Sequence, residues 1–149
     1  MKLILDFDGV ISLENDIITI EDKRYCRFRD YLVDNLRQLI KDKNITNILI
    51  ISNWRKNKDL NYLKDTFKLQ GHEDLSIMVT DMLPYLNTRF FSLLEYIEEN
   101  KDDYILIDDV VDDKVYDVVK HYKKNYNKTL LVYKTDFKEG LSKEFINKQ

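Results

Sequence analysis

The sequence predicts an α/β fold in which a parallel sheet of five strands lies between two layers of helices. Five short apolar runs lack the polar alternation of a strand with one wet face, which is typical of strands buried on both faces of a sheet. Amphipathic helical patterns separate these runs, and this order favours parallel strands joined by right-handed crossovers. The chain of 149 residues is long enough for one core, so we expect residues 1–149 to form a single domain.

The first expected strand is the apolar run Leu3-Ile4-Leu5, which ends at two aspartates and a glycine and should be central in the sheet. Apolar and β-branched runs predict the other four strands at residues 45–51, 76–80, 104–107 and 129–133. Apolar spacings of three and four predict helices at residues 29–43, 56–69, 87–97 and 114–123, and a short one at 141–146. Residues 11–20 predict a small hairpin turning at Asn15-Asp16, which we expect to lie over the site as a flap.

Composition restricts the classes of protein to which the chain can belong. Hydrophobic residues make up 44% and charged residues 34%, which is typical of a folded chain. No apolar run approaches the roughly 20 residues of a membrane helix, and the N-terminus lacks a signal-peptide pattern, so we expect a cytoplasmic (intracellular) protein without a membrane partner. The single cysteine, Cys26, excludes an internal disulfide and a cysteine-rich zinc site. A formal net charge of -3 gives no overall attraction to nucleic acid.

Polar residues follow the predicted strands where each strand ends. Because the carboxyl ends of parallel strands meet at one edge of the sheet, we expect these side chains to converge there. They are Asp6 and Asp8, Ser52 and Asn53, Asp81, Asp108 and Asp109, with Arg89 at a helix start near the same edge. Carboxylates placed together repel one another unless a cation joins them. Since the set contains no His or Cys, its oxygen ligands favour Mg²⁺ over zinc.

These residues, in this order, resemble the motifs of the haloacid dehalogenase (HAD) superfamily of aspartyl-phosphate phosphohydrolases. The segment Asp6-Phe7-Asp8-Gly9-Val10 matches the first motif and Ser52, after an apolar strand, the second. Arg89 is the candidate for the cation of the third motif, and Ile105-Leu106-Ile107-Asp108-Asp109 matches the fourth. The resemblance covers essentially the whole chain and implies a three-layer, Rossmann-like fold.

A finer resemblance is to the small HAD domains associated with RNA repair. In those domains an Asp-Asp motif is followed by a late segment similar to Thr135-Asp136 and Gly140-Leu141 of this chain. The gaps between the motifs hold only the hairpin and a few helices, which leaves no room for a cap domain. An open site admits a bulky substrate such as a nucleic-acid end or a phosphoprotein, unless a partner subunit in an oligomer closes it.

The resemblance implies a covalent mechanism. Asp6 would attack phosphorus and form an aspartyl-phosphate, and Asp8 would protonate the leaving oxygen and then activate water. Mg²⁺ would be held by the Asp6 carboxylate, the backbone carbonyl of Asp8 and an acid of the fourth motif. We expect Asp109 to be the direct ligand, with Asp108 or Asp113 behind it.

The resemblance also implies a binding site for the phosphoryl group. Ser52 Oγ and the Asn53 amide would hold phosphoryl oxygens, and Arg89 would neutralise their charge. Arg55 is a further candidate there, and Arg55 or Lys114 could supply the third-motif cation in place of Arg89. Ser52 has an ordinary alternative, the capping of the next helix, and we favour phosphate binding.

Cations near the predicted site suggest how a nucleic acid would be held. Arg55, Lys56 and Lys58 follow the second motif, and a second cluster lies between Lys23 and Arg29. Acidic neighbours balance the second cluster, so we favour a solvated charged surface over a phosphate path there. We also expect Trp54 to be a core residue, Asp112 to be a helix-start acid, and His72 and His121 to lie on the surface.

The leading hypothesis is therefore a Mg²⁺-dependent phosphatase acting on a nucleotide or nucleic-acid phosphomonoester. A response-regulator-like signalling domain is an alternative, with Asp81 as an acid after strand three and Lys134 on strand five. Its second strand would lie at an edge of the sheet. A third hypothesis is a HAD fold that only binds and does not catalyse.

Overall fold

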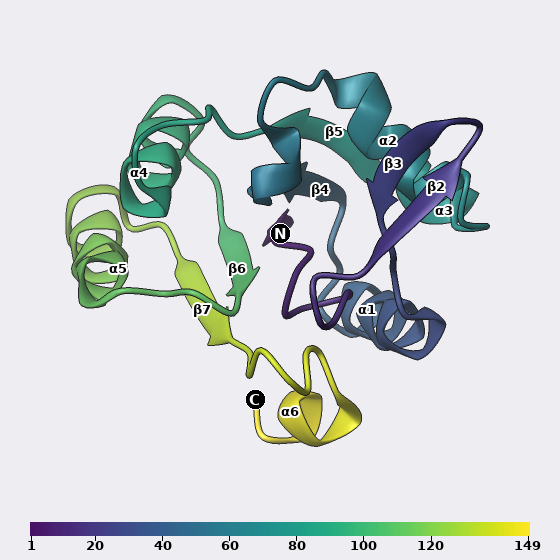
Figure 1. The fold of residues 1–149 in the computed structure, drawn as a ribbon. Helices are drawn as coiled ribbons and strands as arrows, with labels where there is room; N and C mark the ends of the chain where they lie inside the picture. Colours follow the sequence, from purple (N-terminus) through teal and green to yellow (C-terminus); the bar gives the residue numbers. More distant parts are fainter.

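The computed structural model describes residues 1–149 and shows the predicted α/β fold (Figure 1). All strands of the main sheet are parallel, in the order β5-β4-β1-β6-β7. They are β1 (Lys2–Leu5), β4 (Asn47–Ile50), β5 (Val79–Met82), β6 (Tyr104–Asp108) and β7 (Leu130–Lys134). The first strand is central, as predicted, because its residues are apolar on both faces and pair with a strand on each side.

The order of the strands excludes the response-regulator alternative. In that architecture the second strand of the sheet lies at an edge, whereas here β4 lies between β5 and β1. The chain crosses from one half of the sheet to the other after β5, so β1 and β6 become neighbours at the point where the order reverses. Ligands of open α/β sheets bind at the carboxyl ends of strands at such a reversal.

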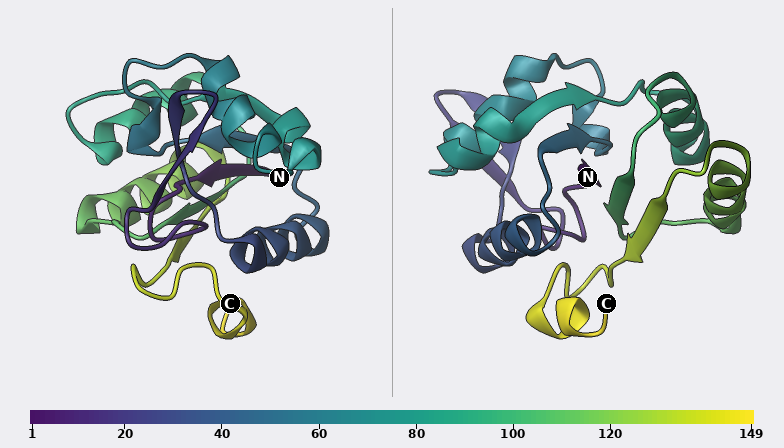
Figure 2. Two further views of the ribbon diagram at one scale, coloured as in Figure 1. Left: turned by 45° about the vertical axis from the view of Figure 1, so that its right-hand side comes forward. Right: turned by 180° about the vertical axis from the view of Figure 1, so that it is seen from behind.

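Helices cover both faces of the sheet (Figure 2). Leu3 and Leu5 of β1 belong to a core shared with α1 (Asp30–Asp42), α2 (Leu60–Lys68) and α3 (Glu73–Met78). Ile4 points to the opposite face, where α4 (Arg89–Glu99) and α5 (Asp113–Tyr126) complete a second core. The short α6 (Lys143–Asn147) closes the chain, and none of the helices is long and apolar enough to cross a membrane.

The predicted hairpin exists, but its predicted position is wrong. It is formed by β2 (Ile17–Ile20) and β3 (Lys23–Cys26), and it turns at Glu21 and Asp22 instead of Asn15-Asp16. Glu21 and Asp22 both have positive φ, 52° and 65°, which a two-residue hairpin turn requires. Asn15, with φ 51°, lies in an earlier turn that leads into β2. Asn favours such turns generally, so the residue type alone did not distinguish the two.

The third strand begins later than predicted. Residues 76–78 were expected in a strand, yet they form the end of α3, and β5 starts at Val79. Glu73 and Asp74 stand in the first turn of α3, where their charges favour the helix dipole. Lys64 Nζ donates to the carbonyls of Ser76 and Val79, which holds the end of α3 against α2. The helix predicted from residue 56 also starts later, where Asp59 caps α2.

His72 is buried, contrary to the prediction of a surface residue. Its Nδ1 accepts a hydrogen bond of 2.8 Å from Arg37 Nη2, which places the proton of the neutral ring on Nε2. His72 Nε2 lies 3.3 Å from an oxygen of Asp30. Burial lowers the pKa of His72, and the charge of Arg37 lowers it further, while Asp30 and Asp74 partly offset both effects.

This environment predicts a loss of stability in mild acid. Because the pKa of His72 is lower in the folded protein than its ordinary value of 6.5, the unfolded chain takes up the proton first as the pH falls. Stability that is present above about pH 6.5 should therefore decline below it. Thermal unfolding at several pH values should show a smaller decline for His72→Gln, which cannot take up that proton. An equal decline in both proteins would contradict the assignment.

Candidate active site

Three aspartates meet at the carboxyl edge of the sheet, between β1 and β6. Asp6 directly follows β1, Asp108 is the last residue of β6, and Asp109 follows it. One carboxylate oxygen from each lies within 4.8 Å of the others. Asp6 and Asp108 are each only 1% exposed, whereas Asp109 is half-buried. The expected convergence of the first and fourth motifs is thus present.

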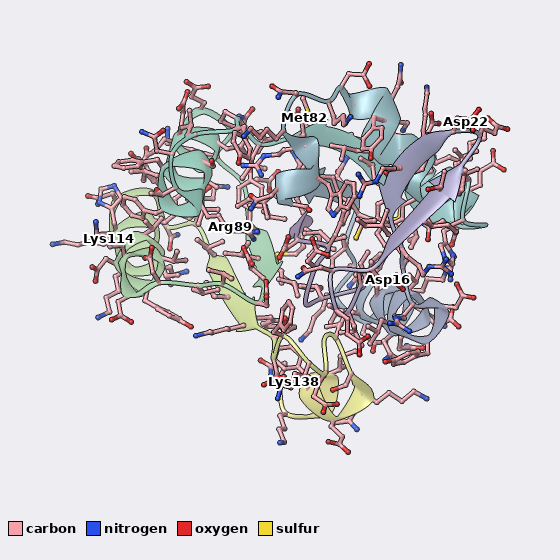
Figure 3. All side chains as sticks on the ribbon, in the orientation of Figure 1. Asp16, Asp22, Met82, Arg89, Lys114 and Lys138 are labelled. Carbon is pink, nitrogen blue, oxygen red and sulfur yellow. The ribbon has the colours of Figure 1, made fainter.

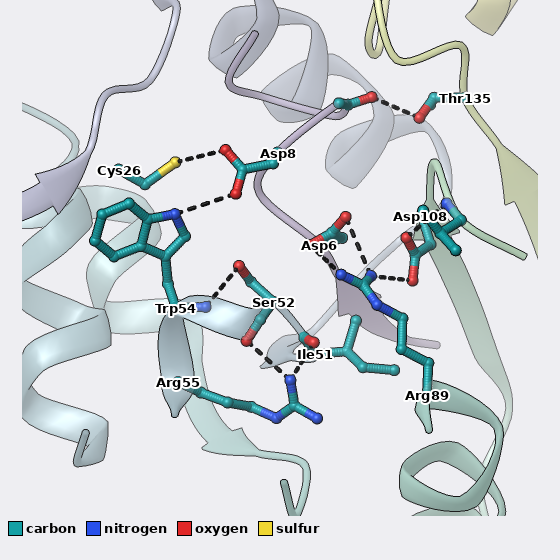
Figure 4. A network of polar contacts seen from close by, with 12 residues as sticks. Asp6, Asp8, Cys26, Ile51, Ser52, Trp54, Arg55, Arg89, Asp108 and Thr135 are labelled. Carbon is teal, nitrogen blue, oxygen red and sulfur yellow. Dashed lines mark hydrogen bonds and ion pairs between the residues drawn. The ribbon is translucent and has the colours of Figure 1, made fainter. Parts of the chain in front are cut away.

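Arg89 closes this cluster (Figure 4). Its Nη1 lies 3.2 Å from Asp6 Oδ2 and 2.5 Å from Asp108 Oδ2, and its Nη2 donates to Asp6 Oδ1 at 3.4 Å. Arg89 is the first residue of α4, whose start is capped by the Thr88 side chain. This cap fixes the helix end from which the guanidinium reaches the two buried carboxylates.

The other two candidate cations of the third motif lie elsewhere. Lys114, on α5, has its ammonium group 5.8 Å from the ring centre of Phe90, and Figure 3 shows it apart from Arg89. Arg55 is buried, and backbone carbonyls surround its guanidinium group. Arg89 is therefore the cation that the structure brings to Asp6.

The cluster carries more negative charge than Arg89 neutralises. Burial raises the pKa of Asp6 well above its usual range, the charge of Asp108 adds to this, and Arg89 only partly offsets it. Burial likewise raises the pKa of Asp108. Asp6 Oδ2 is buried and receives no hydrogen bond. A buried carboxylate oxygen that receives no hydrogen bond, together with two further carboxylates, is a set of ligands that fits a hard divalent cation such as Mg²⁺.

Asp108 and Asp109 have different surroundings. Asp108 pairs with Arg89 and accepts a hydrogen bond of 3.0 Å from the backbone N–H of Val110. Asp109 packs its carboxyl group directly against Gly9, where an added Cβ would lie 2.5 Å from its Cγ and from its Oδ2. Gly9 also has φ +77°. This position therefore favours glycine for two reasons, the backbone conformation and the lack of room for a Cβ atom.

Asp8 points away from the three acids and is held by two donors. Trp54 Nε1 donates to Asp8 Oδ2 at 3.1 Å, and Cys26 Sγ donates to Asp8 Oδ1 at 3.6 Å. Burial raises the pKa of Asp8, and these two hydrogen bonds partly offset the rise. Burial also raises the pKa of Cys26, which keeps the thiol protonated as a donor. The hairpin therefore reaches the site through Cys26, the last residue of β3.

Sequence reasoning identified Asp8 but not its donors. Trp54 was expected in the core; it is partly buried and packs against the larger core while its indole N–H reaches Asp8. Nothing in the sequence around Trp54 indicates that its indole N–H bonds to a carboxylate that follows another strand. The pairing becomes visible only when β1 and β4 lie side by side.

Ser52 and Asn53 follow β4, next to β1. Ser52 is fully buried, and its Oγ accepts a hydrogen bond of 3.3 Å from the backbone N–H of Trp54, which caps the short helix η1 (Asn53–Arg55). The alternative role in capping is thus present. Asn53 is exposed and lines a small pocket together with Asp8. The role of both residues in phosphate binding stays a prediction.

Arg55 is not placed as a ligand of the site, which corrects that prediction. It is 3% exposed, and its guanidinium donates to the backbone carbonyls of Leu83, Ile51, Ser52 and Pro84. Its Nη2 also donates to Ser92 Oγ at 3.3 Å. Burial lowers the pKa of Arg55 to about 10. These hydrogen bonds use the N–H donors of the Arg55 guanidinium and join the loop after β5 to the loop after β4.

Replacing Arg55 should therefore affect stability before chemistry. Arg55→Met would leave several buried carbonyls without donors, and we expect it to destabilise the fold by about 3–5 kcal/mol. Chemical denaturation measures this difference directly. Lys56→Met, at an exposed neighbouring position, is the matched control and should change stability by less than about 0.5 kcal/mol. Equal stability of the two variants would contradict the structural role of Arg55.

The C-terminal segment supports the loop that carries Asp8. Thr135 Oγ1 donates to the Gly9 carbonyl at 2.7 Å, and the Leu141 N–H donates to the Val10 carbonyl at 2.8 Å. Gly140, with φ +62°, lets the chain approach so closely that an added Cβ would lie 2.7 Å from the Val10 carbonyl oxygen. These residues belong to the late segment noted in the sequence, and they position the loop from behind.

Other acids of the sequence lie outside the cluster. Asp81 is exposed within β5 and accepts a hydrogen bond from the Tyr96 hydroxyl, so it does not line the site. Asp112 caps α5 by accepting from the Lys114 N–H at 2.8 Å, which confirms the expected helix-start role. Asp113 is exposed in the first turn of α5.

A comparison with known families agrees with this geometry. Residues 2–146 match the family model described as the HAD domain in Swiss Army Knife RNA repair proteins. The chain belongs to this family. Membership implies a phosphohydrolase type of activity with a divalent metal, and the cluster of three aspartates is compatible with it. No curated protein and no solved structure matches the chain.

Proposed function

We propose that this HAD domain is a Mg²⁺-dependent phosphomonoester hydrolase that acts through an aspartyl-phosphate on Asp6. The observation that carries the proposal is the buried Asp6 oxygen that receives no hydrogen bond, beside Asp108, Asp109 and a single arginine. A carboxylate that served only the fold would have its hydrogen bonds satisfied. A carboxylate that only Arg89 approaches, at 3.2 Å and 3.4 Å, is suited to hold a cation and to act as a nucleophile.

Asp6 and Asp8 divide the covalent chemistry. Asp6 attacks phosphorus, and the bond between phosphorus and the leaving oxygen breaks as Asp8 gives that oxygen its proton. Asp8, now a carboxylate, then takes a proton from water, which attacks the phosphorus of the aspartyl-phosphate and frees Asp6. The hydrogen bonds from Trp54 and Cys26 hold Asp8 in place, and both are retained when its carboxyl group ionises.

Asp6 and Asp109 would hold a divalent cation directly, the backbone carbonyl of Asp8 would be a further ligand, and Asp108 would lie behind them. Such a cation supplies the positive charge that lets an anionic carboxylate approach an anionic phosphate. Asp108 is less available as a direct ligand because Arg89 and the Val110 N–H already occupy it. Asp109 has no comparable partner and is therefore our choice for the direct ligand.

The remaining polar groups fit the phosphoryl oxygens. Arg89 contacts both Asp6 and Asp108, so its charge would lie close to a phosphoryl group that Asp6 attacks. Asn53 lines the pocket that Asp8 also lines. The buried Ser52 Oγ would add an O–H donor. These donors act most strongly where water is excluded, as around the buried Asp6.

The substrate that we propose is a nucleotide or a nucleic-acid end. The description of the family places its members in RNA repair proteins, and the chain has no cap domain that would enclose a small metabolite. The test of the reaction itself needs only a generic substrate. Purified protein should release nitrophenol from p-nitrophenyl phosphate with Mg²⁺, and EDTA should abolish the release.

The same assay separates the hydrolase from a fold that only binds. Asp8→Asn should lower the rate by about a hundredfold or more, since it removes the proton donor and leaves the charge of Asp6 in place. Hydrolysis that is unaffected by EDTA, or by Asp8→Asn, would contradict the mechanism. Absence of release in the wild type, with both p-nitrophenyl phosphate and phosphorylated oligonucleotides, would favour the binding-only alternative.

A further inference from the structure

A surface groove of about 690 Å³ lies next to the candidate active site, between the hairpin and α2. A smaller pocket of about 250 Å³ holds Asp8 and Asn53. The two share Trp54 and Lys58 in their walls, so the groove opens directly onto the pocket of Asp8. The Trp54 side chain is the physical link, because its indole N–H donates to Asp8 while its ring lines the groove.

The groove is lined by cations and aromatic rings. Lys23 and Arg24 come from β3, Lys58 comes from the segment that leads into α2, and Tyr62 comes from α2 itself. Two acids also line it, Asp22 at the tip of the hairpin (Figure 3) and Asp59, whose carboxylate caps α2. The three cations and two acids of the lining leave one positive charge in excess, and Trp54 and Tyr62 are the aromatic residues of the lining.

The nearby basic residues separate into two groups. Arg27 and Arg29 pair with Asp16, at 3.4 Å and 3.7 Å, which agrees with the expected solvated charges. Lys23 and Arg24 form no ion pair within 4 Å and remain available on the groove wall. The cluster between Lys23 and Arg29 therefore has a paired part, Arg27 and Arg29, and an unpaired part that lines the groove.

The walls of the groove are held together before any ligand binds. The ring of Tyr25 stacks on Tyr62 with centroids 5.0 Å apart, and the Tyr62 hydroxyl donates to the Arg24 carbonyl. Lys58 Nζ lies 4.8 Å from the centre of the Tyr62 ring. These contacts fasten β3 to α2, so binding would need little reorganisation of the groove.

We infer that this groove binds the strand of a single-stranded polynucleotide whose terminal phosphate lies at Asp6. The inference rests on the proposed function and narrows its substrate from a mononucleotide to a polynucleotide end. Unpaired cations suit the backbone phosphates, and the ring of Trp54, which lines the groove, suits an unstacked base. The volume exceeds that of the pocket at Asp8 and falls within the range of about 300–1,000 Å³ that organic ligands fill. It provides space for nucleotides beyond the one that carries the phosphate.

Binding tests this inference without requiring catalysis. The probe is a fluorescein-labelled RNA of eight nucleotides with a phosphate on its unlabelled end, titrated with Asp6→Asn protein and followed by anisotropy. Adding Lys23→Gln and Arg24→Gln should raise Kd at least tenfold and lower the salt slope by about 1.4, which is two phosphate contacts at about 0.7 each. The matched control is Lys120→Gln with Lys123→Gln, two exposed lysines of α5, which should change Kd by less than twofold.

Hydrolysis then distinguishes failure of the groove from failure of the mechanism. In the wild-type background the Lys23→Gln, Arg24→Gln protein should lose at least tenfold in the ratio of kcat/KM for the oligonucleotide to kcat/KM for p-nitrophenyl phosphate. Equal Kd values for the groove and control variants, or an unchanged ratio of the two kcat/KM values, would overturn the inference that the groove binds the strand, even if the enzyme is active. Groove-dependent binding by a protein that hydrolyses nothing would support the groove and overturn the proposed mechanism. Melting temperatures confirm that both double variants fold.

Discussion

Replacing Asp6 with Asn should abolish Mg²⁺-dependent hydrolysis, with a loss of about a thousandfold or more in kcat. An amide of the same shape cannot form an acyl phosphate, and it is a poor ligand for a divalent cation. In the proposed mechanism this one side chain has both functions, and it directly follows the central strand, close to Asp108 and Asp109. Steady-state rates with p-nitrophenyl phosphate in Mg²⁺ measure the loss.

The same variant should be more stable than the wild type when no metal is present. Burial and the charge of Asp108 raise the pKa of Asp6, which means that the folded protein disfavours the Asp6 carboxylate at neutral pH. Removing that charge should raise the melting temperature in EDTA, whereas Mg²⁺ should raise it for the wild type and much less for the variant. An inactive variant with a lowered melting temperature in EDTA would point to misfolding and contradict this account.

Replacing Gly9 with Ala should have the second largest effect on activity. The new Cβ would lie 2.5 Å from both Cγ and Oδ2 of Asp109, so the carboxyl group must move away from its neighbours. The positive φ of Gly9 adds about 1–2 kcal/mol of backbone strain for any L-residue with a side chain. We expect Mg²⁺ affinity and kcat/KM each to fall by about 10–100-fold, the usual cost of changing a residue that positions a metal ligand.

Gly71 provides the matched control for this substitution. It also has a positive φ, +89°, but an added Cβ would meet no atom within 4 Å. Gly71→Ala should therefore lose a similar 1–2 kcal/mol or so of stability while its dependence on Mg²⁺ stays that of the wild type. Titrating Mg²⁺ against melting temperature and against rate compares the two. Equal Mg²⁺ dependence of Gly9→Ala and the wild type would remove Asp109 from the metal site.

Local patterns in the sequence were sufficient for the sheet and for the acids at its edge. The run Leu3-Ile4-Leu5 would give a strand with apolar residues on both faces, and it therefore predicted the central strand. Because β1 and β6 are parallel neighbours, Asp6 at the carboxyl end of β1 lies near the carboxyl end of β6. The resemblance to the HAD superfamily identified Arg89 as one of three candidate cations, and the structure brought that one to Asp6.

The rest depended on contacts between distant segments. The hairpin turn at Glu21-Asp22 begins with a glutamate, a residue that seldom adopts positive φ, so Asn15-Asp16 gave the stronger local signal. Arg55 beside the second motif resembled a phosphate ligand, but its partners are carbonyls of a loop about 30 residues further along the chain. His72 is buried, and its ring nitrogen is paired with Arg37 of α1, which lies 35 residues earlier in the chain. No local periodicity reports contacts of this kind.

The most direct test of the central claim is the location of the phosphoryl group during turnover. Enzyme mixed with excess p-nitrophenyl phosphate and Mg²⁺ is quenched in acid within milliseconds and digested, and its peptides are analysed by mass spectrometry. We predict one added phosphoryl group on the peptide that contains Asp6, absent from Asp6→Asn and from enzyme treated with EDTA. A phosphoryl group on another residue, or its persistence in Asp6→Asn, would contradict the assignment of Asp6 as the nucleophile.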